Sequence, residues 1–197
     1  AFAFGYLQKY PSRSYTLAKL GSEFPRYLAE TCPEDERGAW PEFLIDLATL
    51  ELNFNEVFDG PGIEGDSLLD VGQLLAIPAS KWPAARLIPV VCLRLLALRS
   101  PVQRYFSAVR RQEEPTPPEP AETFLAITRR DYVVRHYELA KSSYEIMQDL
   151  VAGQTIGEAV ARAAKRCSSD VDQLERGLQE WFRDWTANGF FQAVTVY

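Results

Sequence analysis

Residues 112–120, which read QEEPTPPEP, constrain the fold more than any other stretch of this sequence. Four of the six residues from Pro115 to Pro120 are prolines. Because proline lacks a backbone N–H and fixes φ, this run cannot continue a helix or a central strand, and it favours an extended spacer. The chain of 197 residues is long enough for two small domains. We therefore predict domains over residues 1–111 and 123–197, joined by a linker over residues 112–122.

The part before the linker predicts a mainly helical domain. Its clearest helix covers residues 40–58, where apolar side chains from Phe43 to Phe58 recur at helical spacing, and Asp59-Gly60-Pro61-Gly62 ends it. Residues 1–10 have the pattern of a helix interior, so we expect further helical sequence upstream of them in the full protein.

Shorter elements of the same part are less uniform. Ser22 and Ser100 each precede a proline-containing start that is typical of a capped helix. The apolar run over residues 87–98 fits a strand at Pro89-Val90-Val91 and a helix after it, so its type stays open. Helices are expected over residues 22–28, 67–76 and 101–111.

The part after the linker predicts a small winged-helix-like domain, because its elements follow the order strand, strand, helix, helix, helix, strand. A capping box at Thr155-Ile-Gly-Glu158 and a cap at Ser169 mark the starts of the second and third helices. The expected strands are residues 123–128, 132–137 and 190–196, and the expected helices are residues 144–153, 156–164 and 170–188. The predicted fold class is α+β, mainly α.

Charge is unevenly distributed along a chain whose net charge is −6. Residues 30–70 contain twelve acidic residues and one basic residue, whereas residues 71–112 contain seven basic residues and no acidic one. The basic stretch either presents a face for phosphate groups or packs beside the acidic helix and is neutralised there; we favour the second interpretation. If the chain binds DNA, the candidate contacts are Arg99, Arg104, Arg110, Arg111, Arg162, Lys165 and Arg166.

DNA binding through the winged helix is disfavoured by charge. The second helix of a helix-turn-helix pair enters the major groove, and here that helix, residues 170–188, has five acidic and two basic residues. The hairpin before it offers another use, because a sheet edge can accept an extended peptide as an added strand. Arg129, Arg130 and Arg135 are candidates for holding acidic residues of such a peptide, although charges on an edge also simply protect it from aggregation.

The sequence shows no arrangement of catalytic or metal-binding residues. It has one histidine, His136, and three widely spaced cysteines, which favour a reducing compartment and form neither a disulfide framework nor a metal motif. Asp46, Glu51 and Glu56 lie on the 40–58 helix, but each step between them is a rotation of about 140°, so they do not form a paired-carboxylate site. We therefore expect no enzyme activity and no cofactor.

Membrane insertion is not expected either. No signal peptide is visible, and the most apolar run, residues 87–98, is interrupted by Pro89 and Arg94 and is too short to span a bilayer. These features favour a cytoplasmic protein.

Three motifs in the first part of the chain resemble a bacterial protein family that carries the name "DNA-binding domain". They are YPSRSYTL at residues 10–17, LGSEFPRYL at residues 20–28, and FLIDLATLE at residues 43–51 followed by Glu56. The likeness covers most of residues 1–111. That family in turn resembles the small partner subunit of methanobactin-type peptide-modifying complexes, and residues 139–156 are similar to winged-helix modules that recognise leader peptides.

The resemblance implies a noncatalytic accessory subunit. Its partner would be an iron-dependent TIM-barrel enzyme that modifies cysteines of a precursor peptide, and the subunit would help to dock that peptide. Asp46, Glu51 and Glu56 match polar positions of the family motif and are the candidates for the enzyme interface. The family name leaves a DNA-binding transcriptional regulator as the alternative.

Overall fold

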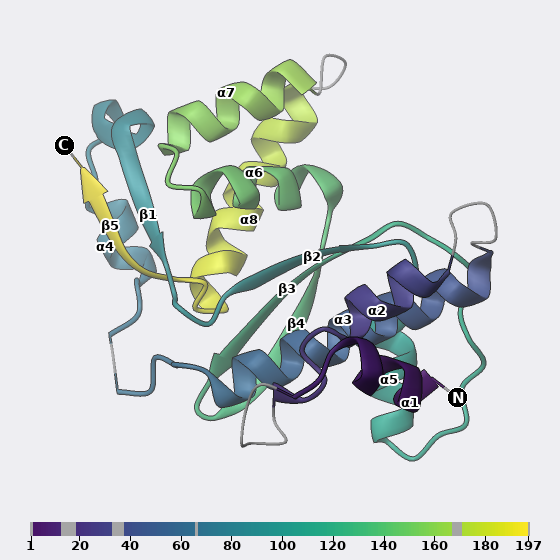
Figure 1. Cartoon of the computed structure of the whole chain (residues 1–197). Helices are drawn as coiled ribbons and strands as arrows, with labels where there is room; N and C mark the ends of the chain where they lie inside the picture. Colours follow the sequence, from purple (N-terminus) through teal and green to yellow (C-terminus); the bar gives the residue numbers. More distant parts are fainter. Residues whose placement is uncertain (1, 13–18, 33–37, 66, 167–170, 197) are drawn as a thin grey trace. The chain divides into compact units, whose positions relative to one another are not determined.

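The computed structural model describes residues 2–12, 19–32, 38–65, 67–166 and 171–196. They form a mixed α/β structure with small antiparallel sheets (Figure 1). The chain divides into two compact units, and each unit is built from two separated pieces of sequence. The first unit contains residues 1–59 and 96–123, and the second contains residues 60–95 and 124–197.

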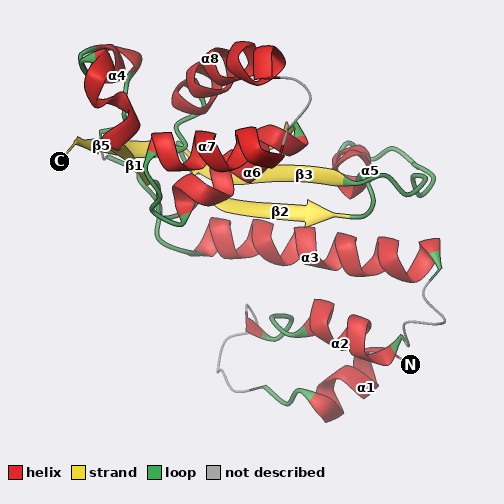
Figure 2. Cartoon of the chain, turned by 90° about the horizontal axis from the view of Figure 1, so that it is seen from above, coloured by secondary structure: helices red, strands yellow, loops and turns green. Residues whose placement is uncertain are grey.

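The first unit is built around its longest helix, α3 (Ala39–Asp59), which buries Phe43, Leu50 and Val57 at the spacing predicted from the sequence. α2 and α5 both pack against α3. Figure 2 shows α1 lying beside α2. The bounds of these three helices are α1 (Phe2–Lys9), α2 (Phe24–Thr31) and α5 (Val102–Arg110).

Aromatic rings join α1 to α2. The ring of Tyr6 lies 5.4 Å from that of Phe24 and 5.6 Å from that of Tyr27, centroid to centroid. The Tyr6 hydroxyl donates a hydrogen bond of 2.5 Å to the carbonyl of Leu20. A buried tyrosine that combines apolar ring contacts with a satisfied hydroxyl fixes both its position and its orientation. Tyr6 therefore anchors the first helix of the unit.

The second unit contains two pairs of strands. β1 (Ala85–Pro89) and β5 (Phe191–Val196) form a two-stranded antiparallel sheet. β3 (Thr123–Arg130) and β4 (Val133–Leu139) form an antiparallel hairpin. The strand order of their sheet is β2-β3-β4, where β2 is Arg94–Leu98 and only its first two residues belong to the second unit. β4 is therefore an edge strand of that sheet among the strands that the structure describes.

Three helices pack together in the second unit. α6 contacts both α7 and α8, and it also contacts β1. Their buried side chains include Met147, Ile156 and Trp185. The bounds are α4 (Val71–Leu75), the 3₁₀ helix η3 (Ala79–Ala84), α6 (Lys141–Val151), α7 (Ile156–Arg166) and α8 (Val171–Ala187). No helix in the described part of the chain has the length and apolar character needed to cross a membrane.

Several local predictions are confirmed. The capping box forms: the Glu158 N–H donates to Thr155 Oγ1 (3.2 Å), and the Thr155 N–H donates to Glu158 Oε2 (2.8 Å). The order strand, strand, helix, helix, helix, strand holds from β3 to β5. Residues 113–122 form neither helix nor strand, as expected from their prolines. The predicted cap at Ser169 lies outside the described residues.

Two predicted helix caps are wrong. The N-cap residues are Glu23 and Pro101, one position after Ser22 and Ser100, and neither makes a side-chain capping bond. The 67–76 helix is shorter than expected, because Asp70 forms a capping box that starts α4 at Val71. The open stretch at residues 87–98 is two strands, β1 and β2, separated by a turn.

The last strand, β5, does not pair with a strand from residues 123–197 among the described strands. β5 pairs with β1, which precedes the linker, and not with the β3–β4 hairpin. Residues 60–95 group with residues 124–197 in the second compact unit. The division into domains at the 112–122 linker stays a prediction.

Candidate functional site

The three carboxylates predicted on α3 face three different surroundings, as their rotation along the helix requires. Asp46 is buried, and its Oδ2 accepts hydrogen bonds from the backbone N–H groups of Arg99 and Ser100, both at 2.8 Å. Burial raises the pKa of Asp46, and the two N–H groups oppose that shift. The described contacts of Asp46 therefore fix the segment that leads into α5.

Glu51 and Glu56 remain exposed on α3. Glu51 lines a pocket of about 630 Å³, and its partial desolvation there raises the pKa of its carboxyl group. Glu56 does not line this pocket. Of the candidates for an enzyme interface, Glu51 and Glu56 are thus accessible and Asp46 is not.

The pocket lies among α1, α2 and α3 in the first unit. Its walls are largely apolar, and Asn55 and Asp59 join Glu51 on its α3 side. We did not anticipate this pocket from the sequence. The signal that was available is the spacing of Glu51, Asn55 and Asp59, which stand four residues apart and therefore follow one side of a helix. The apolar walls are formed chiefly by Tyr6, Leu7, Leu20, Phe24 and Leu52.

A second pocket of about 550 Å³ in the first unit is more polar, and Lys9, Tyr10 and Arg26 among its lining residues all bind Glu30. Glu30 lies within 2.7 Å of the Lys9 ammonium and 2.9 Å of the Arg26 guanidinium, and it accepts a 2.7 Å hydrogen bond from Tyr10. Bonds from Lys9 and Tyr10 lower the pKa of Glu30 to about 2. These contacts hold α1 on α2.

The three arginines predicted on the hairpin are not equivalent. Arg129 lies on β3, the central strand of its sheet, and is only 8% exposed. It binds Glu64 through Nε–Oε1 (2.7 Å) and Nη2–Oε2 (3.1 Å). Arg130 and Arg135 are exposed. Arg135 Nη1 donates to the carbonyl of Arg130 at 3.4 Å. Only these two arginines are therefore available near the hairpin surface.

The turn of the hairpin has an unusual backbone. Asp131 and Tyr132 have φ angles of 52° and 61°, which lie in the left-handed region. That region is typical of two-residue hairpin turns but favours asparagine and glycine. A tyrosine, Tyr132, occupies one of these two positions, and its side chain is 74% exposed.

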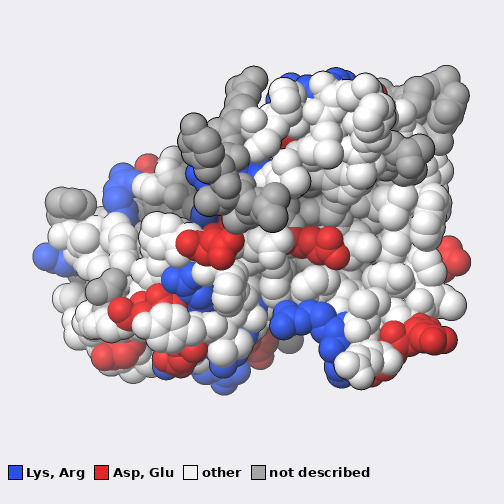
Figure 3. Space-filling view, turned by 60° about the horizontal axis from the view of Figure 1, so that its bottom comes forward, with Lys and Arg blue, Asp and Glu red and all other residues white. Residues whose placement is uncertain are grey.

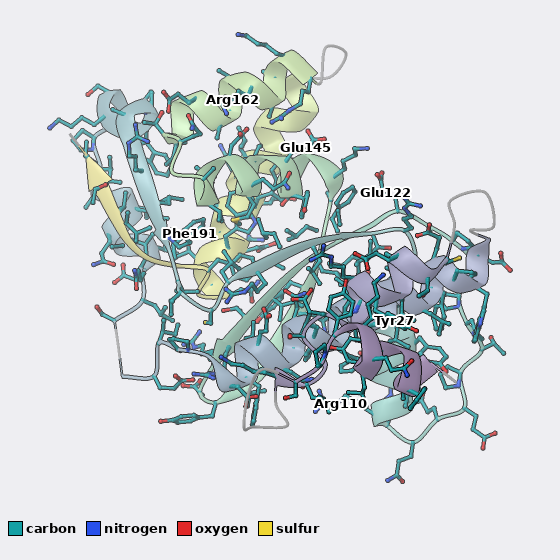
Figure 4. The ribbon with its side chains drawn as sticks, viewed as in Figure 1. Tyr27, Arg110, Glu122, Glu145, Arg162 and Phe191 are labelled. Carbon is teal, nitrogen blue, oxygen red and sulfur yellow. The ribbon has the colours of Figure 1, made fainter. Side chains whose placement is uncertain are left out.

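Most of the predicted DNA contacts are occupied within the protein. Arg162 and Arg166 bind Asp149 at 3.0 and 2.9 Å, and Arg166 also lies 3.2 Å from Glu145; Figure 4 labels Arg162 on α7 and Glu145 on α6. Lys165 is exposed. Phosphate binding through α7 would compete with these ion pairs.

The basic candidates in the first unit have similar surroundings. Arg99 binds Glu42 at 2.6 Å, and Arg111 binds Glu113 at 2.6 Å. The guanidinium of Arg110 lies 5.6 Å from the centre of the Phe106 ring. Arg104 is exposed, and its side chain or backbone also interacts with another part of the protein. On the one face that Figure 3 shows, blue basic groups and red acidic groups lie near one another. The Arg99–Glu42 pair agrees with neutralisation of the basic stretch by the acidic helix.

Metal-binding groups do not converge in the described ranges. No three His, Cys, Asp or Glu side chains there could hold a metal ion. Cys32 and Cys92 are thiols. Cys92 is buried, and its Sγ lies 3.5 Å from Thr128 Oγ1. Cys167 lies outside the described residues.

Comparison with known proteins adds no assignment. No family model matches the sequence, and no curated protein matches it. The sequence motifs and the geometry of the described residues are therefore the basis for a function.

Proposed function

We propose that the chain is a noncatalytic accessory subunit that binds an iron-dependent TIM-barrel peptide-modifying enzyme and helps to dock its precursor peptide. The motif resemblance of residues 10–56 suggests the class of partner. The observation that carries the peptide-docking role is the edge position of β4 in the β2-β3-β4 sheet. We propose further that the β3–β4 hairpin and helices α6, α7 and α8 act as a winged-helix-like module.

The edge of β4 suits an added strand. Edge strands present backbone N–H and C=O groups that can pair with an extended peptide. β4 is seven residues long, which is enough to pair with a short peptide segment. Arg130 and Arg135 supply positive charge for acidic residues of that peptide. Arg129, which is bound to Glu64, is withdrawn from this proposed role.

The enzyme-binding role belongs to the first unit in this proposal. Glu51 and Glu56 keep their carboxylates on the surface of α3. Exposed apolar side chains of the same unit, Phe4 at 70%, Trp40 at 57% and Phe58 at 61%, are of the kind that is enriched at protein interfaces. A partner surface would cover apolar area and place positive charge near the two carboxylates.

Affinity purification tests the partner. The tagged full chain is expressed in its native host, purified after nuclease treatment, and analysed by mass spectrometry and for bound iron. The expected result is a stoichiometric TIM-barrel protein that contains iron. Recovery of the chain alone, or with a partner that contains no iron, would contradict the proposal.

Peptide binding is tested with the precursor peptide that accompanies the recovered enzyme. We expect Arg130→Glu/Arg135→Glu to weaken binding by about tenfold or more, because two favourable charge contacts become repulsive. Lys165→Glu is the matched control, since it reverses an exposed charge on α7. Equal affinities for all three proteins would exclude this docking edge.

The regulator alternative makes a separate prediction. DNA affinity that arises from phosphate contacts falls steeply with salt. With Arg162 and Arg166 held by Asp149, we expect no salt-sensitive binding of a fluorescent duplex in anisotropy titrations. Tight binding at low salt that Arg162→Gln/Arg166→Gln abolishes would favour the alternative.

A further inference from the structure

The pocket on α3 combines an apolar wall with two carboxylates that form no ion pair with the residues that the structure describes. Its volume is about 630 Å³, and the rings of Tyr6 and Phe24 form part of its wall. Glu51, Asn55 and Asp59 line the opposite side. Successive members are four residues apart, so the helix turns them by about 40° at each step and places them in one row.

The carboxylates in this row have no counter-charge in the part of the chain that the structure describes. Glu42 on the same helix forms an ion pair with Arg99, but neither Glu51 nor Asp59 forms one with a described residue. Glu30 on α2 shows the contrast, because it is matched by Lys9 and Arg26. The negative charge of Glu51 and Asp59 is therefore not balanced by positive side chains among these residues.

The end of α3 adds to this negative potential. Asp59 is the last residue of the helix, and the last turn contains no basic residue. The C-terminus of a helix carries a partial negative charge that lysine and arginine usually offset. The Asp59 carboxylate and the helix end thus both make the electrostatic potential near the end of α3 more negative. A cation bound in the pocket would be attracted by Glu51, Asp59 and the helix end together.

We propose that this pocket binds a lysine or arginine side chain of the partner protein. The aliphatic stem would pack against Tyr6, Phe24 and Leu52, and the charged head would lie at Glu51. Asp59 stands eight residues, about 12 Å, further along α3 and would add only longer-range attraction. Long basic side chains have this division between an apolar stem and a charged end. Phe4 and Leu7, which are 70% and 44% exposed on α1, offer apolar area for the neighbouring residues of the same partner segment.

This inference rests on the proposed function for the identity of the partner, but the chemistry of the pocket can be tested alone. The probe is 4-phenylbutylamine, which has an apolar body and an ammonium group, and its uncharged analogue is 4-phenylbutanol. Binding to the full chain is followed by NMR line broadening and chemical shifts. We expect the amine to bind at least about fivefold more tightly than the alcohol, because one charge-assisted bond has this order of magnitude.

Variants locate the binding. Glu51→Gln should remove the preference for the amine, and Asp59→Asn should reduce it. Glu180→Gln, which alters an exposed carboxylate on α8 in the other unit, should leave the preference unchanged. Circular dichroism and thermal unfolding check that each variant is folded. Equal binding of amine and alcohol, or an amine preference that persists in Glu51→Gln, would overturn the proposal.

A second arm uses the recovered enzyme and separates the two proposals. Weaker capture of the enzyme by Glu51→Gln than by Glu180→Gln would support the pocket as the docking site. Undiminished capture by Glu51→Gln would overturn the pocket proposal and leave the accessory role standing. If no enzyme is captured by the unaltered chain, the accessory role fails, and the pocket proposal is then decided by the preference for the amine alone.

Discussion

Arg129 and Glu64 form a two-point ion pair in which the side chains are only 10% and 14% exposed. The pair joins the central strand β3 to the loop that follows Gly60 in the second unit. Two N–H groups of one guanidinium bind the two oxygens of one carboxylate, which is the preferred pairing of these groups. The same pair explains why Arg129 differs from the two exposed arginines of the hairpin.

The first prediction concerns this pair. Arg129→Met should lower the thermal unfolding midpoint, because Glu64 then loses its partner. The double variant Arg129→Met/Glu64→Leu should recover part of the loss, since no partly buried charge is left behind. A double-mutant cycle of unfolding midpoints measures this coupling. Additive effects of the two changes would contradict it.

The pH dependence of the Arg129–Glu64 pair has a defined sign. The bond from Arg129 lowers the pKa of Glu64 below its ordinary value of 4.5. The folded protein therefore binds this proton less readily than the unfolded chain does. The contribution to stability is complete above the ordinary pKa and is lost as the pH falls through the lowered one. Thermal unfolding of the protein and of Arg129→Met between pH 7 and pH 3 should converge at the acid end.

The second prediction concerns Asp46. Asp46→Ala leaves the N–H groups of Arg99 and Ser100 without their acceptor, so it should reduce the free energy of unfolding by about 1–3 kcal/mol. Asp46→Asn keeps a carbonyl oxygen and should cost less. Urea denaturation of both variants measures the difference. Equal losses in the two variants would show that packing, and not the acceptor, is what matters.

The pH effect of Asp46 is opposite to that of Glu64. Burial raises the pKa of Asp46 above its ordinary value of 3.8. The folded state thus holds this proton more tightly than the unfolded state, and the contribution of Asp46 to stability falls as the pH rises from the ordinary pKa through the raised one. Asp46→Asn should remove this component of the pH profile.

The third prediction concerns the hairpin turn. Tyr132→Gly should raise the free energy of unfolding by about 1 kcal/mol, because glycine adopts a φ of 61° without the steric cost that a side chain imposes. Tyr132→Ala is the control: it removes the ring but keeps the cost. Chemical denaturation distinguishes the two. A gain of the same size in Tyr132→Ala would assign the effect to the exposed ring.

The fourth prediction concerns the contact between α7 and η3. A Cβ at Gly157 would lie 2.8 Å from the carbonyl oxygen of Pro83 and 2.9 Å from its Cβ. Gly157→Ala should therefore destabilise the protein by about 1–3 kcal/mol through overpacking. Gly38→Ala places its methyl group in open space and should be close to neutral. Similar losses at both positions would contradict this explanation.

The sequence predicted those elements whose signals are local. The apolar spacing from Phe43 to Val57 identifies α3, and the Thr155-Glu158 capping box identifies the start of α7. Both signals lie within a few residues of the structure they determine. The predicted caps at Ser22 and Ser100 are wrong because neither hydroxyl accepts a helix N–H. Ser22 Oγ donates to the carbonyl of Lys19, and Ser100 Oγ is buried without a hydrogen-bond partner among the described residues.

Non-local relationships were not predictable in the same way. Nothing near Phe191 indicates that its strand pairs with Ala85–Pro89, about a hundred residues earlier. The burial of Arg129 likewise depends on Glu64, which is 65 residues away in sequence. For the candidate site, α3 could be identified as the source of Glu51, but the rings of Tyr6 and Phe24 come from helices that only the fold brings to it.

The pairing of β1 with β5 also affects how the protein is made. β5 is the only strand neighbour of β1 among those described. During synthesis, residues 85–89 leave the ribosome long before residues 191–196, so β1 waits with its pairing groups unmatched and Leu87 uncovered by the strand that later joins it. The second unit can complete its fold only after translation has reached β5, and until then β1 is a point of exposure to chaperones and to other nascent chains.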